Sequence, residues 1–360
     1  MLAGRNIMES QESYAGNPEL TVIVAVYNSA PYLKETLASL FSQRVRCMEL
    51  ILIDDCSTDG SRGVISDFLA HNPVREGMVV QSIRHDNNLG LARTRAEGVS
   101  LARGEWIIFC DSDDVVEYDA YPRMLETAYV NDVDIVVCGF KVFGERVLPG
   151  ISPQGDGVIF WKDLFLSVAQ ARFPVMHGSV CNKLMRRRLW KDVVFPDGLF
   201  FWEDIVALFQ ILMKKPSVYA ISEGLYHYRI RSGSLVATQS SFLGNQCGIL
   251  IPFFENLALG MTDDIIIGIR SKIIELLYRL LKSGSVSAKD FQHNYGAYLG
   301  SVDLNIKHNF LERMHLRLAL SGNASAAFVL GFLNDLGYSL IKTIRYVVWR
   351  MTDLVRHNKS

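Results

Sequence analysis

Short apolar runs alternate with helical patterns between residues 20 and 140 of the chain. Each run is bounded by turn residues, which is typical of buried strands in a parallel sheet. The predicted strands are 20–26, 49–53, 79–83, 105–110 and 134–140. Residues 31–43 carry apolar side chains on one helical face, with Ser29 as the expected cap, and residues 64–69 repeat the pattern. The alternation predicts a mostly parallel α/β sheet with right-handed crossovers.

The rest of the chain changes character twice. Residues 141–160 are rich in Gly and Pro and predict a loop or an antiparallel edge hairpin. A helix is expected over 204–214, followed by short strands at 218–221 and 225–229. From residue 242 onward the pattern is helical. A chain of 360 residues is long enough for one large domain, or for a domain with an extension.

Composition argues against several classes of protein. The apolar content of 49% supports a sizeable core, and a net charge of −1 provides no overall field that would attract nucleic acid. The six cysteines form no C-x-x-C pair and have no histidine spacing suited to zinc, so we expect reduced thiols in a cytoplasmic protein. Residues 1–17 lack the apolar core of a signal peptide, and no run of about 20 apolar residues predicts a spanning helix.

Acidic residues directly follow two of the predicted strands. Asp54 and Asp55 end the second strand, and Asp111, Asp113 and Asp114 follow the fourth. Ligands of open α/β sheets bind outside the carboxyl ends of the strands. Carboxylates gathered there repel one another unless a cation or a proton lies between them. A divalent metal that carries a diphosphate is a natural occupant, although both segments could instead cap the helices that follow.

A third acidic pair, Glu203 and Asp204, lies at the start of the helix predicted over 204–214. The helix dipole favours carboxylates at that position, so capping alone could explain them. The preceding aromatic residues at 200–202 suggest partial burial, which would raise a carboxylate pKa toward the range of a general base. Both interpretations stay open.

Basic side chains that could neutralise a diphosphate lie in three segments. They are Arg93 with Arg95, Lys183, and Arg229 with Arg231. Each could equally be an ordinary surface charge. The chain contains neither G-x-G-x-x-G nor G-x-x-x-x-G-K, so two common nucleotide-binding loops are absent. His177 and His227 have no spacing partner and are expected to be structural.

Four motifs in a fixed order resemble glycosyltransferase family 2. They are TVIVAVYN at 21–28, IDDCSTDGS at 53–61, NLGLAR at 88–93 and GEWIIFCDSDD at 104–114. The ordered set covers residues 20 to about 140 and is highly specific. Weaker matches continue to about residue 235 through NKL at 182–184, WED at 202–204 and the segment 226–234.

The resemblance implies a GT-A fold: a Rossmann-like, mixed, mostly parallel sheet flanked by helices, here with a C-terminal α-helical extension. It implies transfer of a sugar, with inversion, from a nucleotide-diphosphate donor to a glycan or lipid-linked acceptor, with a UDP-linked donor expected and Mn²⁺ or Mg²⁺ required. The implied domains are a polar segment at 1–19, a catalytic domain at 20–235 and the helical extension at 236–360. The catalytic domain would divide into a nucleotide-sugar-binding half at 20–140 and an acceptor-side half at 141–235.

The resemblance also implies residue roles on the donor side. Ala25, Tyr27 and Asn28 would lie beside the base, and Asp54 would contact uracil or ribose. The remaining residues of the predicted nucleotide-sugar site are Asp55, Arg93, Asp111, Ser112, Lys183, Arg229 and Arg231.

Metal binding and catalysis fall to two further groups. Asp111 and Asp113 match the family's aspartate motif, which implies that Asp113 and Asp111 bind the metal. The acidic pair before a helix matches Glu203 and Asp204, and Asp204 is the preferred general base of the two.

Other functions remain open at this point. A catalytically inactive nucleotide-sugar-binding protein would carry the same motifs. A sugar-nucleotide nucleotidyltransferase usually has a Gly-rich basic loop after its first strand, and the chain has none there. A receiver-type signalling module would need an acidic pair where Tyr27 and Asn28 stand, and it would be far shorter.

The end of the chain predicts an amphipathic helix. Between residues 333 and 355 apolar side chains fall on one face, with Lys342, Arg345 and Arg356 opposite. Such a helix suits an anionic membrane surface, which would make the protein peripheral on the inner face of the cell membrane. The same face could instead dock on the catalytic domain, or on a second subunit in a homo-oligomer.

Overall fold

The computed structural model describes residues 5–12, 17–145, 150–169, 178–231, 243–283 and 286–301. The chain divides into two compact units, residues 1–231 and 232–360. The amphipathic helix predicted over 333–355 and His177 lie outside the described residues.

In its described residues, the first unit is built on one mixed sheet of ten strands, in the order β1-β4-β3-β2-β5-β9-β7-β10-β6, with β8 paired to β10 off this path. The strands are β1 (Arg5–Glu12), β2 (Leu20–Val26), β3 (Met48–Asp54), β4 (Met78–His85), β5 (Trp106–Phe109), β6 (Val115–Val116), β7 (Ile135–Gly144), β8 (Gly157–Ile159), β9 (Lys183–Arg186) and β10 (Val218–Ile230). The five strands predicted between residues 20 and 140 are confirmed as β2, β3, β4, β5 and β7. Parallel pairing joins β4, β3, β2 and β5, and β9 enters antiparallel between β5 and β7.

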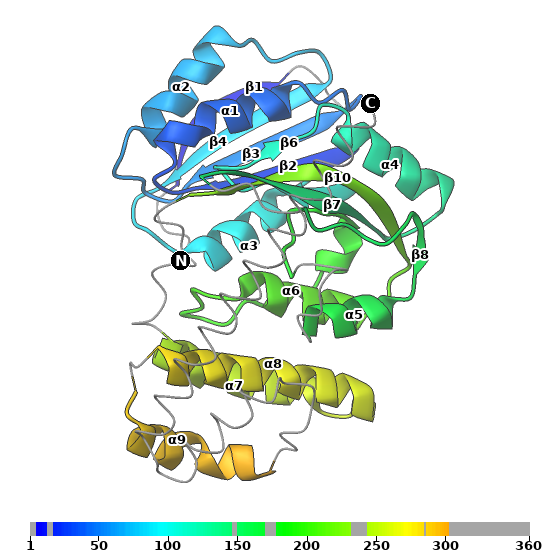
Figure 1. Cartoon of the computed structure of the whole chain (residues 1–360). Helices are drawn as coiled ribbons and strands as arrows, with labels where there is room; N and C mark the ends of the chain where they lie inside the picture. The colour runs from blue at the N-terminus through cyan, green and yellow to red at the C-terminus, as the bar shows by residue number, and fades with distance from the viewer. Residues whose placement is uncertain are drawn as a thin grey trace, which may run out of the picture. The chain divides into compact units, whose positions relative to one another are not determined.

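Helices cover both faces of this sheet. The helices α1 (Ala30–Phe41) and α2 (Ser61–His71) lie on one face, and α3 (Leu91–Leu101) lies on the other (Figure 1). The chain adds β2, β3 and β4 outward in one direction, and α3 then carries it back to β5 on the other side of β2. Because crossovers are right-handed, helices that serve opposite directions lie on opposite faces. The strand order therefore reverses between β2 and β5.

The core lies between the sheet and these helices. All seven residues of β3 are buried, and in β2 only Ala25 is partly accessible. Leu33, Leu37 and Leu40 of α1 are fully buried, as their helical spacing predicts. Burial of each such side chain contributes about 1.5–3 kcal/mol. The two central strands are therefore held firmly, and the loops at their carboxyl ends start from fixed points.

The remaining helices of the first unit come after β5 in the chain. They are α4 (Ala120–Val130), α5 (Trp161–Ala169), the 3-10 helix η1 (Arg187–Trp190) and α6 (Glu203–Leu212). The prediction of two short strands at 218–221 and 225–229 is wrong, because both belong to β10, whose register against β7 shifts between Ile221 and Tyr226. Residues 5–12 show no strand pattern in the sequence but form β1, antiparallel to β4 at the edge of the sheet. Edge pairing uses main-chain groups, so a strand pattern in the side chains is not required.

The second unit is helical in its described part. Its helices are α7 (Leu243–Ala258), α8 (Asp263–Lys282) and α9 (Ala288–Ser301). Among the helices that the structure describes, none combines the length and hydropathy needed to cross a membrane.

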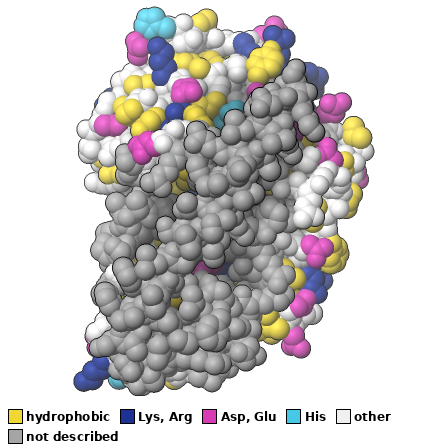
Figure 2. Space-filling view, in the orientation of Figure 1, with side chains coloured by type: hydrophobic (Ala, Val, Ile, Leu, Met, Phe, Trp, Pro, Cys, Tyr) yellow, Lys and Arg dark blue, Asp and Glu magenta, His cyan; other side chains and the backbone are white. Residues whose placement is uncertain are grey.

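The surface and the thiols agree with the composition. On the face shown in Figure 2, the described surface carries acidic and basic side chains close together. All six cysteines are free thiols, and every one except Cys56 is buried.

Close packing of α3 on β2 gives a stability prediction. A Cβ at Gly98 would lie 2.4 Å from Cγ2 of Ile23, whereas a Cβ at Gly63 of α2 would meet no atom within 4 Å. We expect Gly98→Ala to lower the free energy of unfolding by about 1–2 kcal/mol through overpacking. Gly63→Ala should raise it by up to about 1 kcal/mol, because alanine favours the helix. Urea unfolding of both variants tests the contrast, and a stabilised Gly98→Ala variant would contradict the packing argument.

Candidate active site

Two loops meet where the strand order of the sheet reverses. The loop after β2 carries Ser29 and the loop after β5 carries Ser112; both residues are buried and their hydroxyl oxygens lie 2.6 Å apart. Ser29 occupies the N-cap position of α1, but its hydroxyl makes no capping bond to the helix, which differs from the sequence expectation. The shared hydrogen bond joins the two loops. Open α/β sheets bind their ligands outside the strand ends at this reversal point.

The loop after β2 presents an aromatic ring beside a fixed polar turn. Tyr27 is 43% exposed, and it follows a strand end in which Ala25 is half-buried. Asn28 has a positive φ of 49°, and its side-chain oxygen accepts the Thr58 N–H at 2.8 Å and the Asp59 N–H at 3.3 Å. These bonds attach the loop after β2 to the loop after β3. An exposed ring on a fixed loop is suited to stacking on a base.

The acidic pair after β3 separates into two environments. Asp55 accepts hydrogen bonds from Nδ1 of His85 at 2.7 Å and from the N–H groups of Leu89 and Gly90. Burial alone would raise the pKa of Asp55, but these hydrogen bonds lower it below its ordinary value. Asp55 therefore anchors the loop before α3 with both carboxylate oxygens.

Asp54 keeps capacity for a further hydrogen bond. One of its oxygens accepts the Ser57 N–H at 2.9 Å. The other is buried without a hydrogen bond and lies 3.5 Å from a guanidinium nitrogen of Arg84. A buried acceptor without a hydrogen bond is costly, so this oxygen is suited to a ligand donor.

The turn after β5 contains one carboxylate that is fully enclosed. Asp114 is 0% exposed and accepts the Tyr226 hydroxyl at 2.6 Å and the Arg229 N–H at 2.7 Å. Burial, together with the charge of Asp111, raises its pKa. The Tyr226 oxygen also accepts the Asp111 N–H at 3.1 Å. Asp114 and Tyr226 therefore fix the conformation of the turn.

The other two carboxylates of this turn are partly accessible and paired with arginines. The side chains of Asp111 and Asp113 are 35% and 18% exposed. Asp111 pairs with Arg95 at 2.8 Å, and Asp113 pairs with Nε of Arg231. Burial and the charge of Asp111 raise the pKa of Asp113, against the attraction of Arg231. The turn thus attracts positive charge.

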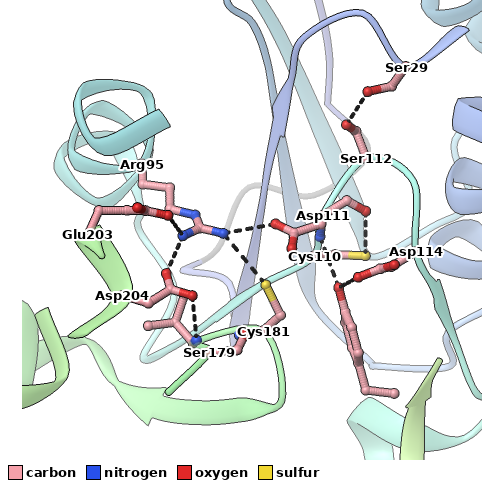
Figure 3. A network of polar contacts seen from close by, with 12 residues as sticks. Ser29, Arg95, Cys110, Asp111, Ser112, Asp114, Ser179, Cys181, Glu203 and Asp204 are labelled. Carbon is pink, nitrogen blue, oxygen red and sulfur yellow. Dashed lines mark hydrogen bonds and ion pairs between the residues drawn. The ribbon is translucent and has the colours of Figure 1, made fainter. Parts of the chain in front are cut away.

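A single buried guanidinium connects this turn to the start of α6 (Figure 3). Arg95 of α3 is 4% exposed and donates to Asp111 at 2.8 Å, to Glu203 at 2.7 Å and to Asp204. Burial opposes its charge, but Asp204 and Asp111 raise the pKa of Arg95 well above its ordinary value. Three carboxylates share this one guanidinium, so the site retains an excess of acidic groups.

A residue in the left-handed conformation precedes α6, and both acidic side chains at the start of this helix reach Arg95. Trp202 precedes the helix with a positive φ of 61°, a conformation that costs a bulky residue about 1–3 kcal/mol. Asp204 also accepts the Val180 N–H at 3.3 Å, and its side chain is 20% exposed against 11% for Glu203. Burial and the charge of Asp204 raise the pKa of Glu203. Asp204 is the more accessible of the two carboxylates.

Lys183 lies at the first position of β9 and is completely buried. Its ammonium donates to the Ser179 carbonyl at 2.5 Å and to the Asn182 side-chain oxygen at 2.9 Å. Burial lowers the pKa of Lys183 to about 8, although Asp204 acts in the opposite direction. In this structure Lys183 supports the segment that contacts Asp204.

Arg95 and Tyr226 lie in the candidate site. Arg95 was named beside Arg93 as a possible partner of a diphosphate, but only Arg93 entered the predicted nucleotide-sugar site, and Tyr226 did not. Arg93 pairs with Asp197 at the surface, where the two side chains are 58% and 92% exposed. Arg95 lies three residues before Gly98 on the buried face of α3, and a charge at such a position indicates an internal ion pair. That signal was available in the sequence. Tyr226 begins the weakly matching segment 226–234, but its contact with the turn after β5 had no signal in the sequence, because only the fold brings β10 to that turn.

The residues present fit a divalent metal that binds together with phosphate groups. Within the described ranges, no three His, Cys, Asp or Glu residues are grouped so as to hold a metal by themselves. Mg²⁺ sites commonly use one or two carboxylates, and substrate phosphates supply further ligands. Asp111 and Asp113 offer two such carboxylates, and a cation would relieve the repulsion that raises the pKa of Asp113.

Comparison with solved structures identifies the fold. Solved structures with the same fold include TarS of S. aureus in complex with UDP-GlcNAc, at a TM-score of 0.67 and 18% identity over 89% of this chain and 92% of that one. Another is the mannosyltransferase PcManGT of Pyrobaculum calidifontis in complex with GDP-Man and Mn²⁺, at a TM-score of 0.51 and 17% identity over 89% and 88%. The fold is therefore the GT-A fold.

Sequence comparison finds a family match within the first unit. The model of glycosyl transferase family 2 matches residues 21–194. The glycosyltransferase EpsJ of Bacillus subtilis is 30% identical over 61% of this chain and 63% of its own length. The chain thus spans about three fifths of this relative. Glycosyltransferase family 2 is the family that the sequence motifs resemble, so the resemblance is confirmed over residues 21–194.

The buried His85 bridge predicts a pH dependence of stability. His85 donates to Asp55 at 2.7 Å and to Glu97 at 2.9 Å, and the hydrogen bond to Asp55 raises its pKa above 6.5 in spite of burial. The stabilisation from charged His85 is complete below about pH 6.5 and is lost as the pH rises through its folded pKa. The contribution of Asp55, whose pKa is lowered from 3.8, is lost as the pH falls through its folded pKa.

We therefore expect His85→Gln to be most destabilising between about pH 4 and pH 6.5, by about 3 kcal/mol. The difference from the wild type should shrink above neutral pH. Denaturant unfolding at pH 5.5 and pH 9 measures this, and equal differences at the two pH values would contradict a charged bridge.

Proposed function

We propose that the protein is an inverting, metal-dependent glycosyltransferase that moves a sugar from a UDP-sugar to a hydroxyl of a glycan or lipid-linked acceptor. The observation that carries this proposal is the Arg95 network, in which one buried guanidinium joins the turn after β5 to the acidic start of α6. Carboxylates suited to a metal and a carboxylate suited to proton removal thereby share one site. The match of residues 21–194 to the model of glycosyl transferase family 2 supports the reaction class.

The donor nucleotide would bind in the loops after β2 and β3. The exposed ring of Tyr27 would stack on the base, next to Ala25 and Asn28. The oxygen of Asp54 that lacks a hydrogen bond would accept one from uracil or ribose. The complex of TarS with UDP-GlcNAc supports a UDP-linked donor, while PcManGT shows that a protein of this fold can bind GDP-Man.

The diphosphate would bind beside the turn after β5. Asp113 and Asp111 would hold Mn²⁺ or Mg²⁺ together with the diphosphate oxygens. The bound metal supplies electrostatic stabilisation of the negative charge that develops on the leaving diphosphate. The Mn²⁺ in the PcManGT complex supports this choice of cation.

Asp204 would act as the general base on the acceptor side. It would take the proton of the acceptor hydroxyl while that oxygen forms a bond to the anomeric carbon. The bond from that carbon to the diphosphate oxygen breaks on the opposite face, so the configuration is inverted and the electron pair leaves with the diphosphate. Arg95 would orient Asp204 through its ion pair, and the greater exposure of Asp204 favours it over Glu203.

Asp113→Asn should abolish sugar transfer and leave the fold intact. Loss of a metal ligand removes several kcal/mol of transition-state stabilisation, which corresponds to at least a hundredfold loss of turnover. UDP release from UDP-sugars in the presence of Mn²⁺ measures activity, with circular dichroism as the check of folding. Asp67→Asn, which changes an exposed aspartate of α2, should have no effect and serves as the matched control. Full activity of Asp113→Asn, or of the wild type in excess chelator, would exclude the metal assignment.

Asp204→Asn should lower turnover by roughly 10²–10⁴ and leave the affinity for UDP unchanged, because a general base acts on the chemical step. Glu203→Gln is the matched variant at the neighbouring carboxylate and should be less damaging. Steady-state kinetics with UDP binding by calorimetry separates the two effects. A greater loss in Glu203→Gln would reverse the roles of the pair, and loss of UDP affinity in Asp204→Asn would indicate a binding role.

A further inference from the structure

The end of β10 brings an arginine onto the carboxylate proposed to bind the metal. Nε of Arg231 donates to Oδ2 of Asp113, and the two side chains are 21% and 18% exposed. The guanidinium carbon of Arg231 also lies 5.4 Å from the centre of the Tyr32 ring. An internal cation therefore occupies one oxygen of Asp113.

The neighbouring arginine is held in a different way. Arg229 donates from Nε to the Asp113 carbonyl at 2.7 Å and from its terminal nitrogen to Glu35 at 2.5 Å. Its guanidinium also lies 5.1 Å from the Tyr32 ring and 4.3 Å from the Phe143 ring. These contacts do not involve the Asp113 carboxylate. Arg229 can therefore keep its position when the partner of that carboxylate changes.

A metal can replace Arg231 beside Asp113, because the carboxylate needs a neighbouring cation but this cation need not be a guanidinium. An uncompensated, partly buried carboxylate is strongly destabilising. A divalent metal would satisfy Asp113 in place of the guanidinium, but Arg231 would then lose its carboxylate partner and lie beside a divalent cation. A diphosphate that arrives with the metal offers Arg231 a new anionic partner, and guanidinium groups bind phosphate oxygens well.

We propose that Arg231 neutralises Asp113 while the donor is absent and transfers its ion pair to the donor diphosphate when the metal takes Asp113. The inference rests on the proposed function, because it takes Asp113 as a metal ligand. It makes Arg231 a positioning residue that couples two binding events. A metal that binds alone must displace Arg231 from Asp113, so it binds weakly. A metal that binds together with a diphosphate binds more tightly, because the diphosphate gives Arg231 a new partner. Such coupling commonly amounts to about 5–150-fold in affinity, and it must be reciprocal.

The test is a titration of the full-length protein with Mn²⁺, with and without saturating UDP, in which free Mn²⁺ is counted by its paramagnetic resonance signal. In the wild type, UDP should tighten Mn²⁺ binding, and Mn²⁺ should tighten UDP binding by the same factor. Arg231→Gln removes the competing cation, so Mn²⁺ alone should bind at least roughly fivefold more tightly than in the wild type. The factor by which UDP raises the affinity for Mn²⁺ should fall by a similar amount.

Two further variants make the result specific. Arg123→Gln removes an arginine that pairs with Glu223 at the surface and should leave both Mn²⁺ affinities unchanged. Arg231→Lys keeps a positive charge at the position, so the affinity for Mn²⁺ in the absence of UDP should stay low. Thermal unfolding of each variant checks that it is folded.

The outcomes separate this inference from the proposed function. One outcome is that Asp113→Asn abolishes Mn²⁺ binding in the presence of UDP, but Arg231→Gln does not raise the affinity for Mn²⁺ in the absence of UDP. The metal site then stands, and the proposed exchange of Arg231 is overturned. If the wild type binds no Mn²⁺ even with UDP, both the exchange and the metal assignment are overturned. Tighter Mn²⁺ binding in Arg231→Gln, with a smaller UDP effect, supports the exchange.

Discussion

The sharing of one buried guanidinium among three carboxylates is the constraint on which the rest of the site depends. Arg95 cannot be buried without anionic partners, and Asp111, Glu203 and Asp204 cannot approach one another without a cation. The partners come from a turn after β5 and from the start of α6, about 90 residues apart in the sequence. The network therefore forms only when both halves of the first unit are folded together, which ties the proposed catalytic chemistry to the stability of the fold.

Environment rather than residue type divides the acidic side chains into two groups. Asp55 and Asp114 have both oxygens engaged by main-chain or side-chain donors, and they fix the loops around the site. Asp54 retains a buried oxygen without a hydrogen bond, and Asp113 is partnered by an arginine at the end of a strand. Adjacent residues in one motif thus serve different purposes. A motif marks the place of a site, but the hydrogen bonds decide which member is available to a ligand.

The sequence was sufficient for the architecture near the site and insufficient for details that depend on tertiary packing. Periodicity predicted β2 to the residue and β3 within one residue at each end, because both strands are continuously buried and bounded by turns. It divided β10 in two, because Glu223 and Gly224 interrupt the pattern at a register shift that main-chain pairing tolerates. The motif led to Arg93, whereas the helical face of α3 selects Arg95. Tyr226 could not be predicted, because its hydroxyl serves two groups more than 100 residues away.

The antiparallel entry of β9 has a consequence for how such enzymes diversify. Between β7 and β9 the described chain adds only the short strand β8 to the sheet, where it pairs with β10 off the main strand path. It then returns through β9, a strand of only four residues inserted between β5 and β7. The hydrogen bonds among β2, β3, β4 and β5 do not involve the residues in between. The segment between β7 and β9 can therefore lengthen, shorten or change sequence during evolution while β2, β3, β4 and β5 keep their register. If the proposed function holds, such changes would alter acceptor preference while the strands proposed to carry the nucleotide site stay unchanged.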